Sequence, residues 1–127
     1  MPIAIDQQFV VLDNTQRATI ESADATLYQR LNENYESFHG HTLISCYEFT
    51  QDWASWEVHP AGDEVVILLS GQATLVLQHE QGLEHIELRY ANDTCVIPSN
   101  IWHTAKISAA TKLLFITPGA GTQHRDV

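Results

Sequence analysis

Residues 56–64 read Trp56-Glu57-Val58-His59-Pro60-Ala61-Gly62-Asp63-Glu64 and are followed by the apolar segment Val65–Leu69. Alternate residues of a strand point to the same side, so we expect Glu57 and His59 on one face. Proline, glycine and aspartate then favour a turn, after which Glu64 opens a second strand. We expect two adjacent antiparallel strands that bring one imidazole and two carboxylates to one end of a sheet. Such donors in an apolar setting are typical of a transition-metal site.

A second stretch, residues 92–103, ends at another histidine, His103. Together the two stretches resemble the cupin superfamily. Its first motif is Gly, five residues, His-x-His, three or four residues, Glu, six residues, Gly. Here four residues separate His59 from Glu64, and six separate Glu64 from Gly71. The resemblance covers about residues 53–118.

The second cupin motif is Gly, five residues, Pro-x-Gly, two residues, His. Asn92, Pro98, Asn100 and His103 keep this spacing. Asparagine stands at both glycine positions, and it is the residue other than glycine that best tolerates a positive φ. We therefore expect tight turns with positive φ at both asparagines.

The resemblance implies an all-β double-stranded β-helix, or jelly-roll barrel, with one short N-terminal helix. Length and composition agree with one domain, because 127 residues with 44% hydrophobic side chains can bury a core. We expect residues 8–39 to form a strand and the helix, residues 41–118 the barrel, and residues 119–127 a C-terminal tail that contains His124.

The residue pattern outlines these elements. Strands are predicted at residues 9–12, 18–20, 42–49, 53–59, 64–69, 73–77, 83–88, 94–97, 103–107 and 113–117. Between the second and third of them, Tyr28, Leu31, Tyr35 and Phe38 recur at helical spacing. Ser22 or Asp24 could cap this helix, and Gly40 could close its C-terminus.

Net charge indicates which partners are unfavourable, and cysteine content indicates the redox environment. Sixteen acidic against six basic residues give a formal charge of −10, which argues against nucleic acid and membrane partners. One disulfide between Cys46 and Cys95 is possible, but we expect reduced, buried thiols in a cytoplasmic protein. Residues 1–8 show no signal peptide.

The resemblance implies that Glu57, His59, Glu64 and His103 converge as metal ligands, with Glu57 where the family usually has its first histidine. Two neutral imidazoles and two carboxylates around a divalent cation carry no net charge, which suits a partly buried cavity. Two histidines and one carboxylate also form the set that holds non-haem iron(II). Glu57 is then a fourth ligand or a catalytic proton-transfer group. The cofactor would be Fe, Mn or Zn, and the alternative is a metal-free polar network.

Three functions remain open. The first is a metal-dependent oxygenase or isomerase that acts on a small, oxygen-rich organic molecule. The second is a non-catalytic cupin that binds or senses a small ligand, and the third is a structural cupin with a filled barrel. Residues 56–64, 102–104 and 117–119 look like those of small single-domain bacterial cupins. Since cupins commonly dimerise, the resemblance also favours a homodimer.

The remaining histidines and aromatic residues receive other roles. His39, His41, His79 and His85 are expected to be solvated. Trp53, Tyr47 and Phe49 could line a cavity as an apolar wall, although packing alone would also explain each of them. Strand parity places Trp56 on the face away from Glu57 and His59. Residues 65–69 and 74–77 are apolar on both faces, so their outer face needs cover from the second sheet, the N-terminal segment or another subunit.

Overall fold

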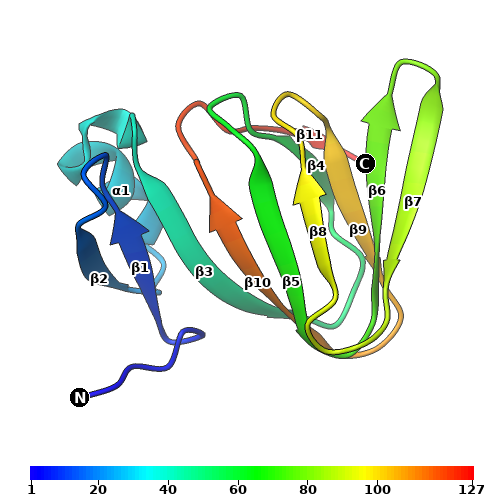
Figure 1. Ribbon diagram of the computed structural model, residues 1–127, viewed down its shortest axis with the longest axis horizontal. Helices are drawn as coiled ribbons and strands as arrows, with labels where there is room; N and C mark the ends of the chain where they lie inside the picture. Colours follow the sequence, from blue (N-terminus) through cyan, green and yellow to red (C-terminus); the bar gives the residue numbers. More distant parts are fainter.

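The computed structural model describes all 127 residues and consists of two antiparallel sheets that face each other (Figure 1). One sheet has six strands in the order β2-β1-β3-β10-β5-β8, and the other has five in the order β11-β4-β9-β6-β7. The strands are β1 (Gln8–Leu12), β2 (Ala18–Ser22), β3 (Thr42–Phe49), β4 (Ser55–Val58), β5 (Glu64–Ser70), β6 (Ala73–His79), β7 (Gly82–Leu88), β8 (Thr94–Ile97), β9 (His103–Ile107), β10 (Thr111–Thr117) and β11 (Gln123–Asp126). The predicted all-β jelly roll is confirmed.

Two short helical segments lie between β2 and β3, namely α1 (Leu27–Asn34) and a 3-10 turn (Glu36–Phe38). No helix of the chain has the length and apolarity needed to cross a membrane. The predicted N-caps, Ser22 and Asp24, are wrong, because Thr26 is the N-cap residue and its side chain makes no capping bond. Asp24 instead accepts the Thr26 backbone N–H at 3.0 Å, which shapes the turn before the helix. Gly40 follows the C-cap of the 3-10 turn with a φ of 71°.

The expected hairpin between the first two motif strands is wrong. β4 pairs with β9 and β11, whereas β5 pairs with β10 and β8, so the two strands lie in different sheets. The connection, residues 59–63, crosses the space between the sheets instead of reversing within one sheet. Glu64 therefore meets His59 across the barrel. The physical reason is that β5 is apolar on both faces and lies inside the larger sheet, where it needs a neighbour on each side.

The predicted C-terminal tail is also different in the structure. Residues 123–126 form β11, which pairs with β4 in register, so that His124 lies opposite Glu57. All four residues of β11 are polar and exposed. The strand therefore carries no apolar alternation from which it could have been predicted. Its position at the sheet edge brings the end of the chain to the site.

The hydrophobic core divides into two clusters. The larger lies between the two sheets and includes Val66, Leu68, Leu75 and Leu113, each fully buried. The smaller joins α1 to β1 and β3 through residues such as Phe9, Leu31 and Leu43. Leu31 and Phe38 of the residues at helical spacing are buried, while Tyr28 is exposed. Both cysteines are free and buried, as expected.

Turn geometry agrees with the two motifs. Asn92 and Asn100 have φ values of 81° and 64°, as predicted for residues at the family's glycine positions. Gly71 has a φ of +84°, and a Cβ atom there would lie 2.4 Å from the carbonyl oxygen of Ala110. Only glycine fits at this close approach between the β5–β6 turn and the start of β10.

Candidate metal centre

Three different parts of the barrel supply the four predicted residues. Glu57 lies on β4, and His59 follows the end of that strand. Glu64 is the first residue of β5 in the opposite sheet, and His103 is the first residue of β9. The β4–β9 pairing places Glu57 directly opposite His103. The topology therefore brings residues from both sheets to one end of the barrel.

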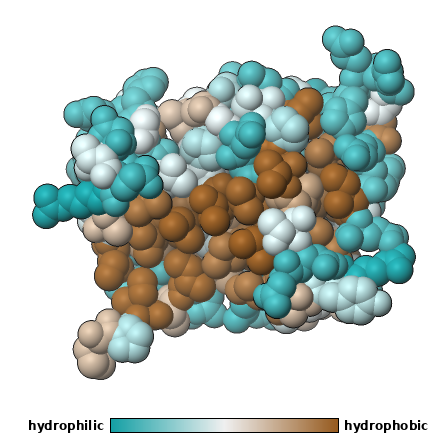
Figure 2. Space-filling view, viewed as in Figure 1, coloured by the Kyte–Doolittle hydropathy of each residue, from teal (hydrophilic) through white to brown (hydrophobic).

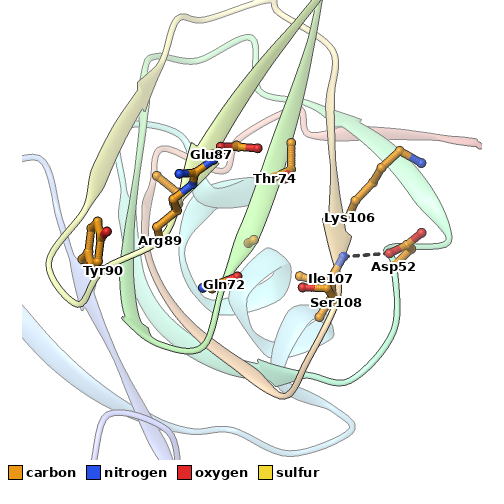
Figure 3. A pocket seen from close by; sticks show the side chains of 11 residues that line it. Asp52, Gln72, Thr74, Glu87, Arg89, Tyr90, Lys106, Ile107 and Ser108 are labelled. Carbon is orange, nitrogen blue, oxygen red and sulfur yellow. Dashed lines mark hydrogen bonds and ion pairs between the residues drawn. The ribbon is translucent and has the colours of Figure 1, made fainter.

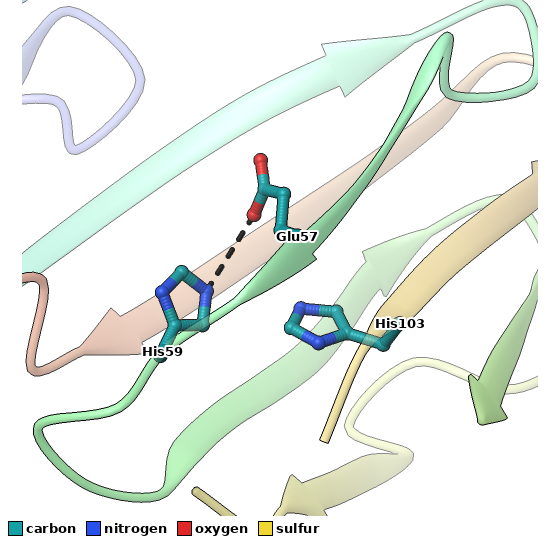
Figure 4. Close-up of side chains that lie close together, drawn as sticks. All are labelled: Glu57, His59 and His103. Atoms are coloured by element: carbon teal, nitrogen blue, oxygen red, sulfur yellow. Dashed lines mark ion pairs between the residues drawn. The ribbon is translucent and has the colours of Figure 1, made fainter. Parts of the chain in front are cut away.

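The side chains converge closely, and Figure 4 shows three of them, Glu57, His59 and His103. His103 Nε2 lies 3.1 Å from Glu64 Oε1, and His59 Nε2 lies 3.3 Å from Glu64 Oε2. His59 Nε2 is also 3.5 Å from Glu57 Oε2. Donor atoms of Glu57, His59 and His103 all lie within 4.8 Å of one another, a spacing that could hold a metal ion. The predicted meeting of the four side chains is therefore observed, while their role as ligands stays a prediction.

Hydrogen bonds fix which nitrogen of each imidazole faces the cluster. Thr122 Oγ1 donates to the carbonyl oxygen of Gly119 at 2.8 Å, so it accepts from His59 Nδ1–H, also at 2.8 Å. His103 Nδ1 lies 3.1 Å from the carbonyl oxygen of Ile101, which can only accept. Both histidines therefore carry a proton on Nδ1. In the neutral form their lone pairs lie on Nε2, the nitrogen that points toward the carboxylates.

Several of these polar atoms are buried without a hydrogen bond. They are His59 Nε2, His103 Nε2 and Glu64 Oε1. The other oxygen of Glu64 accepts a hydrogen bond of 2.5 Å from Thr117 Oγ1. An unpaired buried polar atom costs about 1–3 kcal/mol, so natural proteins rarely leave three together. Nitrogen and oxygen lone pairs that converge in this way fit a divalent cation such as Fe, Mn or Zn.

Without a cation, the charges of the cluster shift the pKa of two members. Burial alone would lower the pKa of His59, but the carboxylates of Glu57 and Glu64 outweigh burial and raise this pKa to about 9. Burial would raise the pKa of Glu64, yet His103 and His59 outweigh it and lower this pKa to about 2. The metal-free cluster is thus held together by a protonated His59 between two carboxylates. A metal would replace that proton.

Two residues near the cluster were not predicted from the sequence. Thr122 orients His59, and His124 Nε2 lies 3.3 Å from Glu57 Oε1. Both belong to the C-terminal segment that had been expected to form a tail. No motif spacing marks them, because they reach the site only through the pairing of β11 with β4. His39, His79 and His85 are exposed, as predicted, whereas His41 is half-buried.

A cavity of about 900 Å³ opens beside the cluster. Its walls include the predicted residues Tyr47, Phe49 and Trp53 together with Glu57, His59 and Glu64. A smaller hollow of about 550 Å³ has no histidine (Figure 3). There Asp52 accepts the Ile107 backbone N–H at 2.7 Å, and Arg89 pairs with Glu87. The larger cavity is the one that adjoins the candidate metal centre.

Solved structures with the same fold include a cupin-2 domain protein, an oxidase and an epoxidase. A cupin-2 domain protein from Shewanella frigidimarina superimposes with a TM-score of 0.52 at 22% identity, covering 61% of this chain and 70% of that one. An oxalate oxidase gives a TM-score of 0.53 at 16% identity, with 64% and 44% covered. The hydroxypropylphosphonic acid epoxidase from S. wedmorenis gives 0.52 at 13% identity, with 60% and 43% covered.

These similarities establish the fold. The chain has the cupin fold, so the predicted resemblance is confirmed at that level. It spans less than half the length of the two named enzymes. No protein-family model and no curated protein sequence matches it. Because one fold hosts many functions, the function has to be argued from the site.

The pKa shifts predict how the stability of the metal-free protein depends on pH. His59 has a folded pKa of about 9, above its ordinary 6.5, so its contribution is complete below 6.5 and is lost as the pH rises toward 9. Glu64 has a folded pKa of about 2, below its ordinary 4.5, so its contribution is present above 4.5 and is lost as the pH falls toward 2. Urea unfolding of EDTA-treated protein should show greatest stability between about 4.5 and 6.5.

The matched control is His85→Gln, which replaces an exposed histidine on β7 and should keep this pH profile. His59→Gln should flatten the decline above pH 6.5. If the metal-free protein became more stable as the pH rose from 6.5 to 9, the placement of His59 between two carboxylates would be wrong.

Proposed function

We propose that this protein binds a divalent metal through His59, Glu64 and His103, with Glu57 as a fourth ligand or proton-transfer group, and that it acts on a small organic molecule. The observation that carries the proposal is the convergence of three buried, unpaired donor atoms, His59 Nε2, His103 Nε2 and Glu64 Oε1. Fe, Mn and Zn all suit imidazole and carboxylate ligands. A protein of the same fold, HppE, has been crystallised with Fe(II).

Different residues of the chain would bind the metal, orient a ligand and accept a proton. His59 and His103 hold the ion through Nε2, and Thr117 orients Glu64 by donating to Oε2. When bound, the metal supplies a Lewis-acid centre with open positions for an oxygen donor. Glu57 is partly exposed to the cavity, so its carboxylate can accept a proton from a molecule held there. Oxygenation and isomerisation both remain compatible with this arrangement.

One observation favours a second candidate, a non-catalytic and metal-free cupin that binds or senses a small ligand. Each oxygen of Glu57 faces a histidine, with His59 at 3.5 Å and His124 at 3.3 Å. In this alternative the carboxylate belongs to a polar network of the protein and the cavity alone binds the ligand. The third function, a filled structural barrel, receives no such support, because the cavity beside the cluster is large.

Ligand substitutions test the metal proposal. His59→Ala and His103→Ala should each weaken Zn²⁺ binding by more than about 100-fold, because each removes one of two imidazole donors. Glu57→His should retain or tighten binding, since it restores the ligand that cupins usually have there. Calorimetric titration of untagged, EDTA-treated protein measures these affinities, with the exposed His85→Ala as control. A folded Glu57→His variant that takes up no metal would show that Glu57 does not lie beside the ion.

Thr122 provides a separate test of imidazole orientation. Thr122→Val keeps the shape of the side chain but removes the oxygen that accepts from His59 Nδ1. Loss of such a partner typically weakens metal binding by about 10- to 100-fold. Thr122→Ser should restore it, because serine keeps the hydroxyl. Equal Zn²⁺ affinities for the valine and serine variants would argue that Thr122 does not orient His59.

We also infer that a second copy of the chain covers the outer face of the six-stranded sheet. α1 cannot cover it, because this helix packs on the opposite side of β1 and β3 through Phe9, Val11 and Leu43. The register aligns one apolar residue from each strand across the outer face: Ile20, Val10, Ile44, Ile116, Val65 and Val96. Figure 2 shows an apolar band across this view. A self-complementary apolar band of this kind is typical of two-fold interfaces.

The dimer is tested at the exposed ends of this row. Val96→Glu, at a residue 58% exposed, should convert a dimer to a monomer in light scattering coupled to gel filtration. Leu83→Glu is the matched control, because Leu83 is 53% exposed but lies on β7 in the other sheet. A monomeric parent protein would refute the inference, as would a Val96→Glu variant that stays dimeric.

A further inference from the structure

Several aromatic side chains in the lining of the large cavity contact one another and reach the candidate metal centre. Trp53 lies at the middle of this wall, with ring centroids 5.5 Å from Phe49 and 5.9 Å from Phe115. Tyr47 extends the wall outward, 6.2 Å from Phe49. On the inner side, Trp53 lies 6.2 Å from the ring of His103. The aromatic wall therefore runs without interruption from the tyrosine to a candidate ligand.

Hydroxyl groups lie beside the aromatic residues in the cavity lining. The hydroxyls of Tyr28 and Tyr47 lie 2.6 Å apart and form one hydrogen-bonded pair at the cavity. Ser45 adds a small hydroxyl side chain to the lining. A flat ring could therefore lie against the aromatic wall with a polar substituent at either end.

The lysines and arginines of the chain all lie outside the cavity lining. No lysine or arginine is among the 23 lining residues, whereas Asp52, Glu57 and Glu64 are. The positive side chains near the barrel are engaged elsewhere. Arg125 stacks over Trp102 at 4.5 Å and hydrogen-bonds Gln78, and Lys112 pairs with Asp6. An anionic ligand would thus lose its hydration without gaining a lysine or arginine as a partner.

Glu57 strengthens this bias against anions. With Glu57 and Glu64 both ionised, a divalent cation in the cluster is fully neutralised, as two negative charges balance two positive ones. A histidine at position 57, as in most cupins, would leave one positive charge to attract an anion. With glutamate instead of histidine at position 57, the metal-loaded centre has one positive charge fewer, so it attracts carboxylates and phosphonates less strongly.

We propose that the cavity binds an uncharged ring compound that carries a hydroxyl or carbonyl oxygen, and that it discriminates against anionic ligands of the same size. The aromatic wall binds the ring face, and the oxygen points toward the cluster of Glu57, His59 and His103. The role of this oxygen and the charge balance at Glu57 rest on the proposed metal. The preference for a neutral ring rests on the aromatic wall and on the absence of lysine and arginine from the lining.

The experiment compares 2-naphthol, which is uncharged at neutral pH, with 2-naphthoate, which has the same ring system and a negative charge. Calorimetric titration is carried out on Zn²⁺-loaded and on metal-free protein, and the zinc content of each sample is measured. We expect 2-naphthol to bind on the order of tenfold more tightly than 2-naphthoate. Glu57→His, loaded with Zn²⁺, should narrow this difference by improving the affinity for 2-naphthoate.

Two variants locate the binding. Trp53→Leu should lower 2-naphthol affinity on the order of tenfold, because it removes the centre of the wall. Trp56→Leu should leave it unchanged, since Trp56 does not line the cavity. Thermal unfolding checks that both variants fold.

The results separate this inference from the proposed function. If the protein takes up no zinc but still prefers 2-naphthol to 2-naphthoate, the metal proposal is wrong and the inference about the cavity is supported. Equal or tighter binding of 2-naphthoate, no binding of either probe to the folded parent protein, or equal losses in the two tryptophan variants would overturn the inference.

Discussion

Three polar atoms with lone pairs, His59 Nε2, His103 Nε2 and Glu64 Oε1, face one another inside the barrel and dominate the electrostatics of the site. His59 Nε2 and His103 Nε2 lie 3.3 and 3.1 Å from the carboxylate of Glu64, and neither nitrogen completes a hydrogen bond. Such an arrangement is stable only when a positive charge lies among the atoms. A proton on His59 can supply that charge. A divalent cation would interact with the lone pairs of His59, His103 and Glu64 together.

The fold explains how these atoms come together. Strands far apart in the sequence contribute from opposite sheets, and the loop after β4 crosses between them. The C-terminal strand then closes the site, because Thr122 fixes the orientation of His59 and His124 faces Glu57. Buried aliphatic side chains fill the barrel interior, and the aromatic residues Tyr47, Phe49 and Trp53 lie between this core and the cavity.

Much of this could be predicted from spacing, and the failures have physical causes. The intervals between His59, Glu64 and Gly71 indicated the barrel, and asparagine at positions 92 and 100 indicated turns with positive φ. Spacing does not tell which sheet a strand joins, so the β4–β5 connection was interpreted as a hairpin. β11 has no apolar residue, and its contribution to the site follows from pairing alone. Thr122 and His124 were missed for the same reason.

The most direct test is a crystal structure of protein purified without an affinity tag, with diffraction data collected above and below the absorption edges of Fe, Mn and Zn. The account predicts one anomalous peak bonded to Nε2 of His59, Nε2 of His103 and the carboxylate of Glu64. A structure of metal-supplemented protein with no peak there, and with a proton-mediated bond between His59 and Glu64 in its place, would contradict it.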